Sequence, residues 1–188
     1  MVPHIRRWWP EHPLVLVVDG GLAAVSLAWA GVNSRVTMVS RRRGDAALDH
    51  PPGPQPPGQR GRNPLQGKRH RRVQAWAEQA DTPWDTVDVD GYGGQRQPLW
   101  VFSPTALWYT PGWPPVDSRE VLVCDPTGKL HRDAVFCTDR QATPEQILPW
   151  VVRRWSVEVT CEEARAPLGL ETQPPWSDHA IARTTPLW

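Results

Sequence analysis

Three hydrophobic patterns follow one another in the N-terminal part of the chain. Leu14–Val18 is a continuous apolar run closed by Asp-Gly-Gly, which predicts a short strand buried on both faces. The Ala-rich segment Leu22–Ala30 predicts a helix, and Arg35–Ser40 alternates like a second strand. A strand-helix-strand order of this kind is typical of an α/β fold.

The middle of the chain has the shorter patterns of β structure. A hairpin is expected around the turn Gly91-Tyr92-Gly93-Gly94, and Pro98 should restrict its second strand to a sheet edge or to a late start. A second pair is expected around the turn Asp125-Pro126-Thr127-Gly128. The elements predicted are a short helix at Val73–Ala80 and strands at Thr86–Asp90, Leu99–Ser103, Glu120–Cys124 and Ala134–Thr138.

A long helix should begin near Thr143. Thr143 and Gln146 have the spacing of a capping box, and Pro144 suits the first helical position. Pro149 removes one helical hydrogen bond, so the helix should kink after Leu148 or restart at Pro149. Both options keep Val151–Arg165 helical, with an end at Pro167-Leu168-Gly169. Beyond that end, Ser177 or Asp178 should cap a further short helix towards Arg183.

One face of this long helix has the residues of a candidate site. Arg154, Glu158 and Arg165 are spaced by four and seven, so at about 100° per residue they fall within one sector. The apolar stripe beside them is Leu148, Val152, Trp155 and Val159. Glu158 therefore has a half-buried position suited to a catalytic carboxylate. The alternative for Glu158 is an ordinary surface pair with Arg154, and for Trp155 a place in the core is favoured over base stacking.

Between the strands and the β-rich middle lies a basic segment without periodicity. Its Pro- and Gly-rich part, Pro51–Arg62, excludes a helix or a central strand. Local basic charge in a chain of net charge +1 suggests a polyanion partner, with a solubilising loop as the equally weighted alternative. The basic residues are Arg41, Arg42, Arg43, Arg60, Arg62, Lys68, Arg69, Arg71 and Arg72.

Cysteine usage and the N-terminus bear on the cellular compartment. Cys124, Cys137 and Cys161 are widely spaced, and the isolated histidines are expected at the surface, so neither a disulfide framework nor a zinc site is indicated. The apolar run from Leu14 to Val32 resembles an exported or anchored segment, but Asp19 interrupts it at a cost of about 2.5–3.5 kcal/mol on membrane-insertion scales. A cytoplasmic protein without a membrane anchor is therefore favoured.

Asp19 is a second carboxylate that could join Glu158 in the candidate site. Asp19 ends a buried strand and Glu158 lies far downstream on a helix, an arrangement that can bring two carboxylates to one sheet edge. Converging carboxylates can hold a pair of Mg²⁺ ions for phosphoryl transfer. A cap on the following helix is the equally weighted alternative for Asp19.

The chain resembles the catalytic domain of bacterial insertion-sequence transposases of the DDE type, in the group with a β-rich insertion between the second and third acids. That group has a helix signature of Tyr, two residues, Arg, three residues, Glu, six residues and Lys, which stands here as Val151, Arg154, Glu158 and Arg165. Further similar segments are V-V-D-G-G-L-A at 17–23, the Pro-rich loop, A-L-W-Y-T-P-G at 106–112, and 153–186.

The resemblance implies a fold, a chemistry and a set of partners. The fold is an α/β, ribonuclease-H-like core formed by 1–40 and 141–188, with a basic loop at 41–72 and a β-rich insertion at 73–140. The implied activity is Mg²⁺-dependent DNA strand cleavage and transfer, with Asp19 and Glu158 as catalytic metal ligands. DNA is the implied partner, and a homo-oligomer is left open. The implied DNA contacts are Arg154, Arg165, Arg41, Arg42, Arg43, Arg60, Arg62, Lys68 and Arg69.

Three departures from the family qualify this expectation. The family needs a first Asp on an earlier strand, and Glu11 is the only acid before Asp19. Val151 replaces the signature Tyr, and Cys161 replaces an expected aromatic residue. We therefore expect an incomplete core, with unpaired backbone and apolar surface where the strand is missing. A fragment inactive on its own, or a non-enzymatic nucleic-acid-binding remnant, is the resulting hypothesis.

Overall fold

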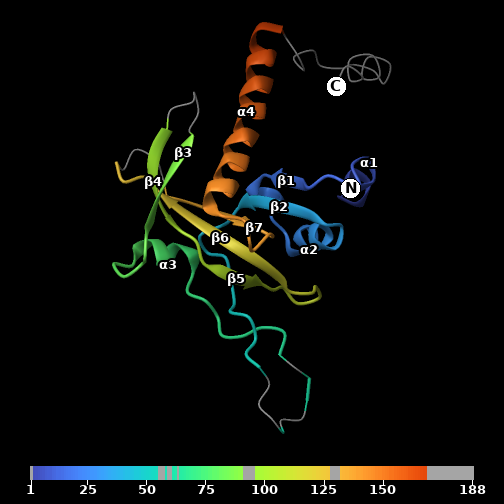
Figure 1. Ribbon diagram of the computed structural model, residues 1–188, viewed down its shortest axis with the longest axis vertical. Coiled ribbons are helices and arrows are strands. Elements are labelled where there is room, and N and C mark those ends of the chain that lie inside the picture. The colour runs from blue at the N-terminus through green and yellow to red at the C-terminus, as the bar shows by residue number, and fades with distance from the viewer. Residues whose placement is uncertain are drawn as a thin grey trace. The chain divides into compact units, whose positions relative to one another are not determined.

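The computed structural model describes residues 2–54, 58, 61–62, 64–90, 96–127 and 132–168, and for 155–158, 161 and 163–168 it describes the backbone alone. The chain divides into two compact units, Met1–Val152 and Arg153–Trp188. The first unit is a mixed sheet with helices, as expected for an α/β fold (Figure 1). The predicted turn at 91–94 and the short helix after Ser177 lie outside the described residues.

The N-terminal half of the sheet is a parallel pair. β1 (Leu14–Val18) aligns with β2 (Val36–Arg41) from Leu14 opposite Val36 to Val18 opposite Ser40. Between them lie the 3₁₀ turn η1 (Gly20–Leu22) and α2 (Val25–Asn33), so the helix begins three residues later than predicted. The delay follows from the Asp19 side chain, which accepts a hydrogen bond from the Gly21 N–H and caps the 3₁₀ turn instead.

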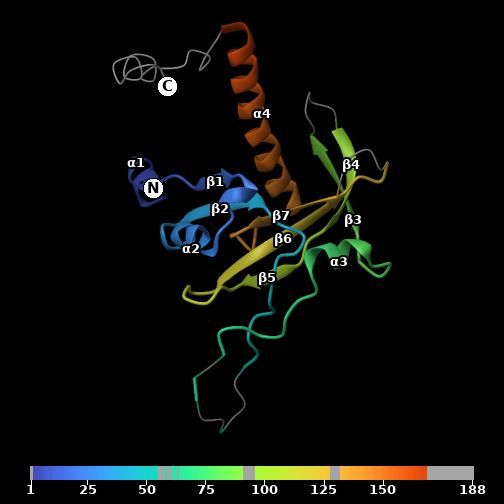
Figure 2. The same ribbon diagram turned by 180° about the vertical axis from the view of Figure 1, so that it is seen from behind.

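The remaining strands continue the same sheet. They are β3 (Asp85–Asp90), β4 (Arg96–Phe102), β5 (Thr105–Trp108), β6 (Val116–Cys124) and β7 (Asp133–Cys137). The order is β1-β2-β7-β6-β4-β3, with β5 also paired to β6, and every pair except β1–β2 is antiparallel. The β-rich segment is thus an extension of the core sheet, visible as one surface in both views (Figures 1 and 2).

Pro98 lies inside β4 and does not delay it. At Pro98 the strand pairs with Asp88 of β3, whereas its pairing with β6 begins only at Trp100. The missing proline N–H therefore falls where β4 has one neighbour, which is the edge position that proline tolerates. The expected late start was wrong, since β4 begins at Arg96.

Helices cover both faces of the sheet. One face packs Val39, Val121 and Val135 against Ile147 and Leu148 of α4 (Pro144–Leu168). On the opposite face, α2 packs on Met38 and Phe136, and α3 (Val73–Glu78) packs on Leu122 and Ala134. A short helix that the sequence pattern did not predict, α1 (Val2–Trp8), contacts α2.

The Gln146 half of the predicted capping box is present at the start of α4. The Thr143 N–H donates to Oε1 of Gln146 over 3.0 Å, and the helix begins at Pro144 and ends at Leu168, as predicted. The helix continues through Pro149 as one element, so a restart there was wrong. Pro149 is the sixth residue of α4. It has no N–H, so one helical hydrogen bond is lost, while the buried Ile147 and Leu148 hold this turn against the core.

Candidate functional site

Asp19 lies directly after β1, at the carboxyl end of the parallel pair. Its side chain is exposed, and one oxygen, Oδ2, accepts the Gly21 N–H over 3.1 Å. Its backbone oxygen accepts a hydrogen bond from the buried Ser40 hydroxyl on β2 over 3.1 Å. The end of β1 is therefore fixed from both sides, and the carboxylate projects at the place where ligands bind in open α/β sheets.

Glu158, Arg154 and Arg165 lie on α4 beyond the first compact unit. Their backbone is helical, as predicted, which keeps the three residues on one sector of the helix. Arg154 is half-buried. Asp19 belongs to the first compact unit and Glu158 to the second, so a site shared by the two stays a prediction. Within the described part of the chain, no three His, Cys, Asp or Glu side chains form a metal-binding group.

Glu11, the one acid before Asp19, lies in a bend between α1 and β1 and is exposed. It belongs to none of the strands of the sheet. The expectation that Glu11 offers no strand-borne carboxylate is confirmed for the described structure.

The prediction that Arg42 contacts DNA was wrong. Its side chain is 2% exposed and is paired with Glu120, which is completely buried. Nε and Nη2 of Arg42 donate to the two carboxylate oxygens over 3.0 and 2.8 Å, and Ser118 donates to the same carboxylate over 2.7 Å. The guanidinium also lies 4.1 Å from the ring centre of Trp108 and 4.0 Å from that of Phe136. Arg42 is thus a core residue, because its burial on the sheet removes it from any phosphate.

Three other predicted DNA contacts take part in exposed or half-exposed ion pairs. Arg41 pairs with Asp133, Arg43 with Asp45, and Arg69 with the buried Asp49. The Arg43 guanidinium lowers the pKa of the Asp45 carboxyl by hydrogen bonding. Local acids therefore offset part of the basic charge that the sequence suggested. Arg62 and Lys68 are exposed, whereas Arg60 lies outside the described residues.

The base of the basic loop is held by backbone hydrogen bonds. Asp49 and Leu107 of β5 exchange hydrogen bonds of 2.9 and 2.7 Å, which fix the outgoing arm to the sheet. The returning arm is bound to the outgoing one, because His50 donates to the Lys68 carbonyl and His70 to that of Leu48, each over 2.8 Å. The described loop residues between these arms form no helix or strand, as predicted.

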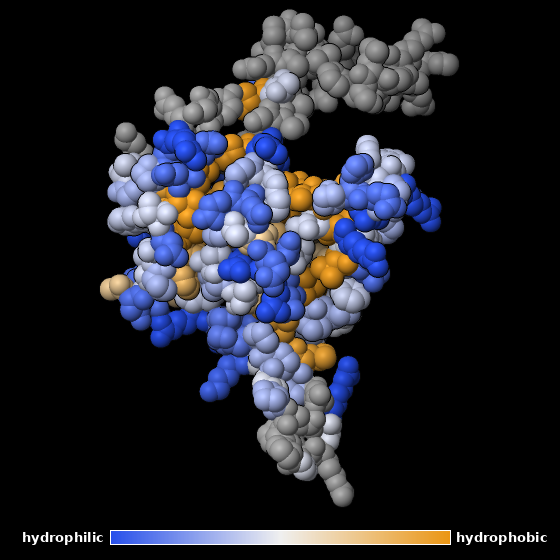
Figure 3. Space-filling view, in the orientation of Figure 1, coloured by the Kyte–Doolittle hydropathy of each residue, from blue (hydrophilic) through white to orange (hydrophobic). Residues whose placement is uncertain are grey.

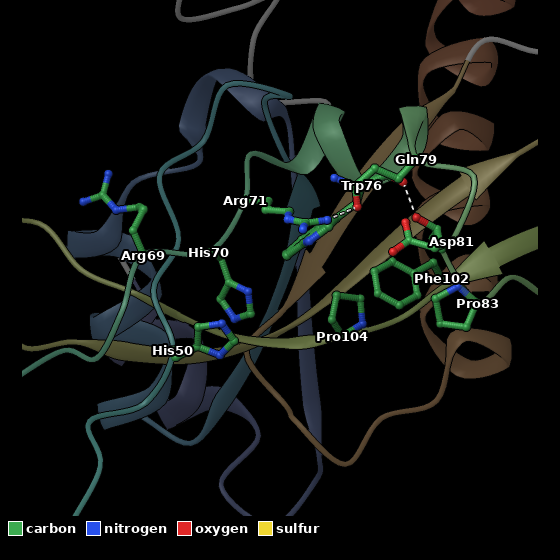
Figure 4. Close-up of a pocket in the computed structure, with 11 residues that line it drawn as sticks. His50, Arg69, His70, Arg71, Trp76, Gln79, Asp81, Pro83, Phe102 and Pro104 are labelled. Carbon is green, nitrogen blue, oxygen red and sulfur yellow. Dashed lines mark hydrogen bonds between the residues drawn. The ribbon is translucent and has the colours of Figure 1, made fainter.

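A cavity of about 450 Å³ opens beside this base (Figure 4). The imidazoles of His50 and His70 lie with ring centres 3.5 Å apart on one side of it, and Trp76 and Phe102 form apolar walls. Arg71 extends over the opening towards Gln79, with which it is hydrogen-bonded, whereas Arg69 points away from the cavity. The lining therefore combines apolar walls with polar groups of both signs, since Asp81 also lines the cavity.

His70 differs from the expected surface position. It is half-buried, and its pKa is lowered by burial and by the neighbouring His50. The contact could not be predicted, because His50 and His70 are brought together only when the loop between them closes. The Arg42–Glu120 pair was missed for the same reason, since its partners belong to different predicted segments.

No family model matches this chain, and no curated protein matches it either. The helices of the described residues include none that is long and apolar enough to cross a membrane.

Proposed function

We propose that this chain is part of the catalytic domain of a DDE-type DNA transposase, in which Asp19 and Glu158 are two of the acids at the reacting phosphate. The observation that carries the proposal is the position of Asp19. It is an exposed carboxylate directly after the first strand of the parallel β1–α2–β2 unit. The resemblance of the α4 signature and of the segment around Asp19 to this transposase group supports the same assignment.

The sheet supports the finer fold assignment. A parallel pair with one connecting helix, continued by antiparallel strands and followed by the long α4, is compatible with an incomplete ribonuclease-H-like core that has a β-rich insertion. In that arrangement β1 would lie next to the strand that bears the first acid. β1 pairs only with β2 among the strands of this sheet.

Mg²⁺ is the cofactor that fits these donors, because carboxylate oxygens are its preferred protein ligands. Bound there, it would activate a water or hydroxyl and stabilise the leaving oxygen. The chain's own contribution is to hold the carboxylates in place. The cap to Gly21 and the Ser40 contact orient Asp19, and the helical backbone of α4 keeps Arg154 and Glu158 on one sector of the helix.

Mg²⁺ stabilisation of the folded protein tests this proposal. A ligand that binds only the folded state raises the unfolding temperature with its concentration. Wild type should respond to Mg²⁺, and Asp19→Asn and Glu158→Gln should each lose the response. Asn keeps the oxygen that accepts the Gly21 N–H, so a role in capping alone predicts no change. Asp45→Asn and Glu162→Gln are matched exposed controls that should respond like wild type.

The catalytic part of the proposal is tested by nicking of supercoiled DNA. With two of the three acids, the 188-residue chain should show no Mg²⁺-dependent nicking. Nicking that disappears in Glu158→Gln would show instead that the chain alone forms a complete site. A response to Mg²⁺ that survives both Asp19→Asn and Glu158→Gln would refute the shared role of these acids.

The second candidate function is nucleic-acid binding without catalysis. The exposed side chains of Arg62 in the loop and of Lys68, Arg71 and Arg72 at its returning arm favour it. Binding through phosphate contacts weakens steeply with salt. Salt-sensitive DNA binding combined with no response to Mg²⁺ would support this alternative over the transposase site.

A further inference from the structure

The two edges of the sheet differ in charge. β3, at one edge, has the exposed acids Asp85, Asp88 and Asp90. β1, at the other edge, has the sequence Leu-Val-Leu-Val-Val and no charged residue. Charged side chains on an edge strand prevent it from pairing with other strands. β3 therefore has this protection and β1 lacks it.

β1 is also less buried than its apolar composition predicts. Val15 is 37% exposed, and Leu14, Leu16 and Val17 are half-buried. Leu16 packs beside Met38 on one face of the sheet, and Val17 packs beside Val39 on the other. Figure 3 shows apolar side chains, in orange, at the surface where β1 and α2 lie in Figure 1. Apolar side chains are therefore partly exposed on both faces of the sheet at β1.

The backbone of β1 offers the hydrogen bonds for a new neighbour. Its only strand partner among the described residues is β2. In a parallel pair, alternate N–H and C=O groups of a strand point away from its partner. An added strand would satisfy these groups and cover the apolar side chains at the same time.

We propose that β1 pairs antiparallel with β1 of a second copy of this chain, about a two-fold axis at Leu16. Leu16 then lies opposite its own symmetry mate, Val15 opposite Val17, and Leu14 opposite Val18. Even-numbered residues thus lie opposite even-numbered ones, and odd opposite odd. Side chains that lie on one face of the sheet in one copy therefore continue onto the same face in the other copy. Both copies use the same surface in this contact, so the assembly is a closed dimer.

Charges at the two ends of β1 favour the antiparallel arrangement. Arg6 donates to the carbonyl oxygens of Trp9 and His12, which holds its guanidinium beside the start of β1. The exposed Asp19 follows the end of β1. Antiparallel pairing sets Arg6 of each copy near Asp19 of the other, whereas parallel pairing would set the two Asp19 carboxylates together. The segment before β1 has Arg6 and Arg7 against the single acid Glu11.

This pairing needs no catalytic step, although it takes the edge of β1 that a strand bearing the first acid would occupy in the proposed transposase core. Sedimentation equilibrium of the full chain tests it directly. Wild type should reach twice the monomer mass as concentration rises. Val15→Lys should stay monomeric, because a cation on each strand would face the partner's apolar strand. Thr86→Lys, at an exposed position on β3, is the matched control and should dimerise like wild type.

Cross-linking tests the register. In a chain with Cys124→Ser and Cys161→Ser, Leu16→Cys should form a disulfide-linked dimer on mild oxidation, because directly opposed residues are within bonding distance. Leu14→Cys should not, because the two copies of residue 14 would lie about 13 Å apart along the strands. A monomeric wild type, open-ended association, dimers of Val15→Lys, or cross-links at Leu14→Cys without Leu16→Cys would each overturn the proposal.

Discussion

Replacing Arg42 with methionine should destabilise the protein strongly. Methionine keeps the length of the side chain but removes both hydrogen bonds to Glu120, of 3.0 and 2.8 Å, and the contacts over Trp108 and Phe136. It leaves a carboxylate that is 0% exposed, and among the described residues Ser118 is its one remaining donor. Breaking a buried pair from one side costs about 3–5 kcal/mol. For a domain of this size that corresponds to a fall in melting temperature of about 10 °C.

Urea denaturation measures this loss as a change in the unfolding free energy.

Two further variants separate the buried pair from a general effect of losing a cation. Arg43→Met removes the neighbouring arginine, whose pair with Asp45 is exposed, and should unfold close to wild type. Arg42→Met combined with Glu120→Leu should recover most of the stability, because no buried charge remains unpaired. If Arg42→Met unfolds like Arg43→Met, the reasoning is refuted and Arg42 returns to the candidate DNA contacts.

Three other outcomes follow from the structure. The buried Cys137, whose pKa is raised by burial to about 11, should react with a thiol reagent only on unfolding, whereas the half-exposed Cys124 should react in the folded Cys161→Ser protein. Because the pKa of His70 is lowered from 6.5, mainly by burial, the folded state takes up its proton less readily; wild type should lose more unfolding free energy than His70→Gln as the pH falls below 6.5, measured by urea titration at each pH. Lys68→Gln and Arg62→Gln should each reduce the salt dependence of DNA binding by about one counterion in a filter-binding titration.

Helices and strands could be predicted where the local sequence favoured a single structure. Leu14–Val18 has the predicted bounds because a continuous apolar run meets Asp-Gly-Gly. Thr143 and Gln146 marked the start of α4 correctly, because the capping box is a local signal. β5, at Thr105–Trp108, was missed because it is short, and its pairing with β6 decides its state.

The environment of charged residues could not be predicted from local composition. Arg41, Arg42 and Arg43 are consecutive, yet their side chains are half-exposed, buried and exposed. The difference arises because Arg42 lies on the face of the sheet that packs Trp108 and Phe136, and because Glu120 on β6 lies within reach. The burial of β1 could not be predicted from composition either. Its composition predicted a fully buried strand, whereas its place at the sheet edge leaves it half-exposed.

Iron-directed cleavage tests the shared site of Asp19 and Glu158 most directly. Fe²⁺ that replaces Mg²⁺ generates hydroxyl radicals with ascorbate and peroxide, and these cut the backbone beside the bound ion. We expect cuts both after β1, near Asp19, and on α4, near Glu158. Both cuts should be suppressed by excess Mg²⁺ and lost together in Asp19→Asn. Cuts at one of the two positions alone, or cuts that persist in Asp19→Asn, would contradict the claim that these two acids hold one metal site.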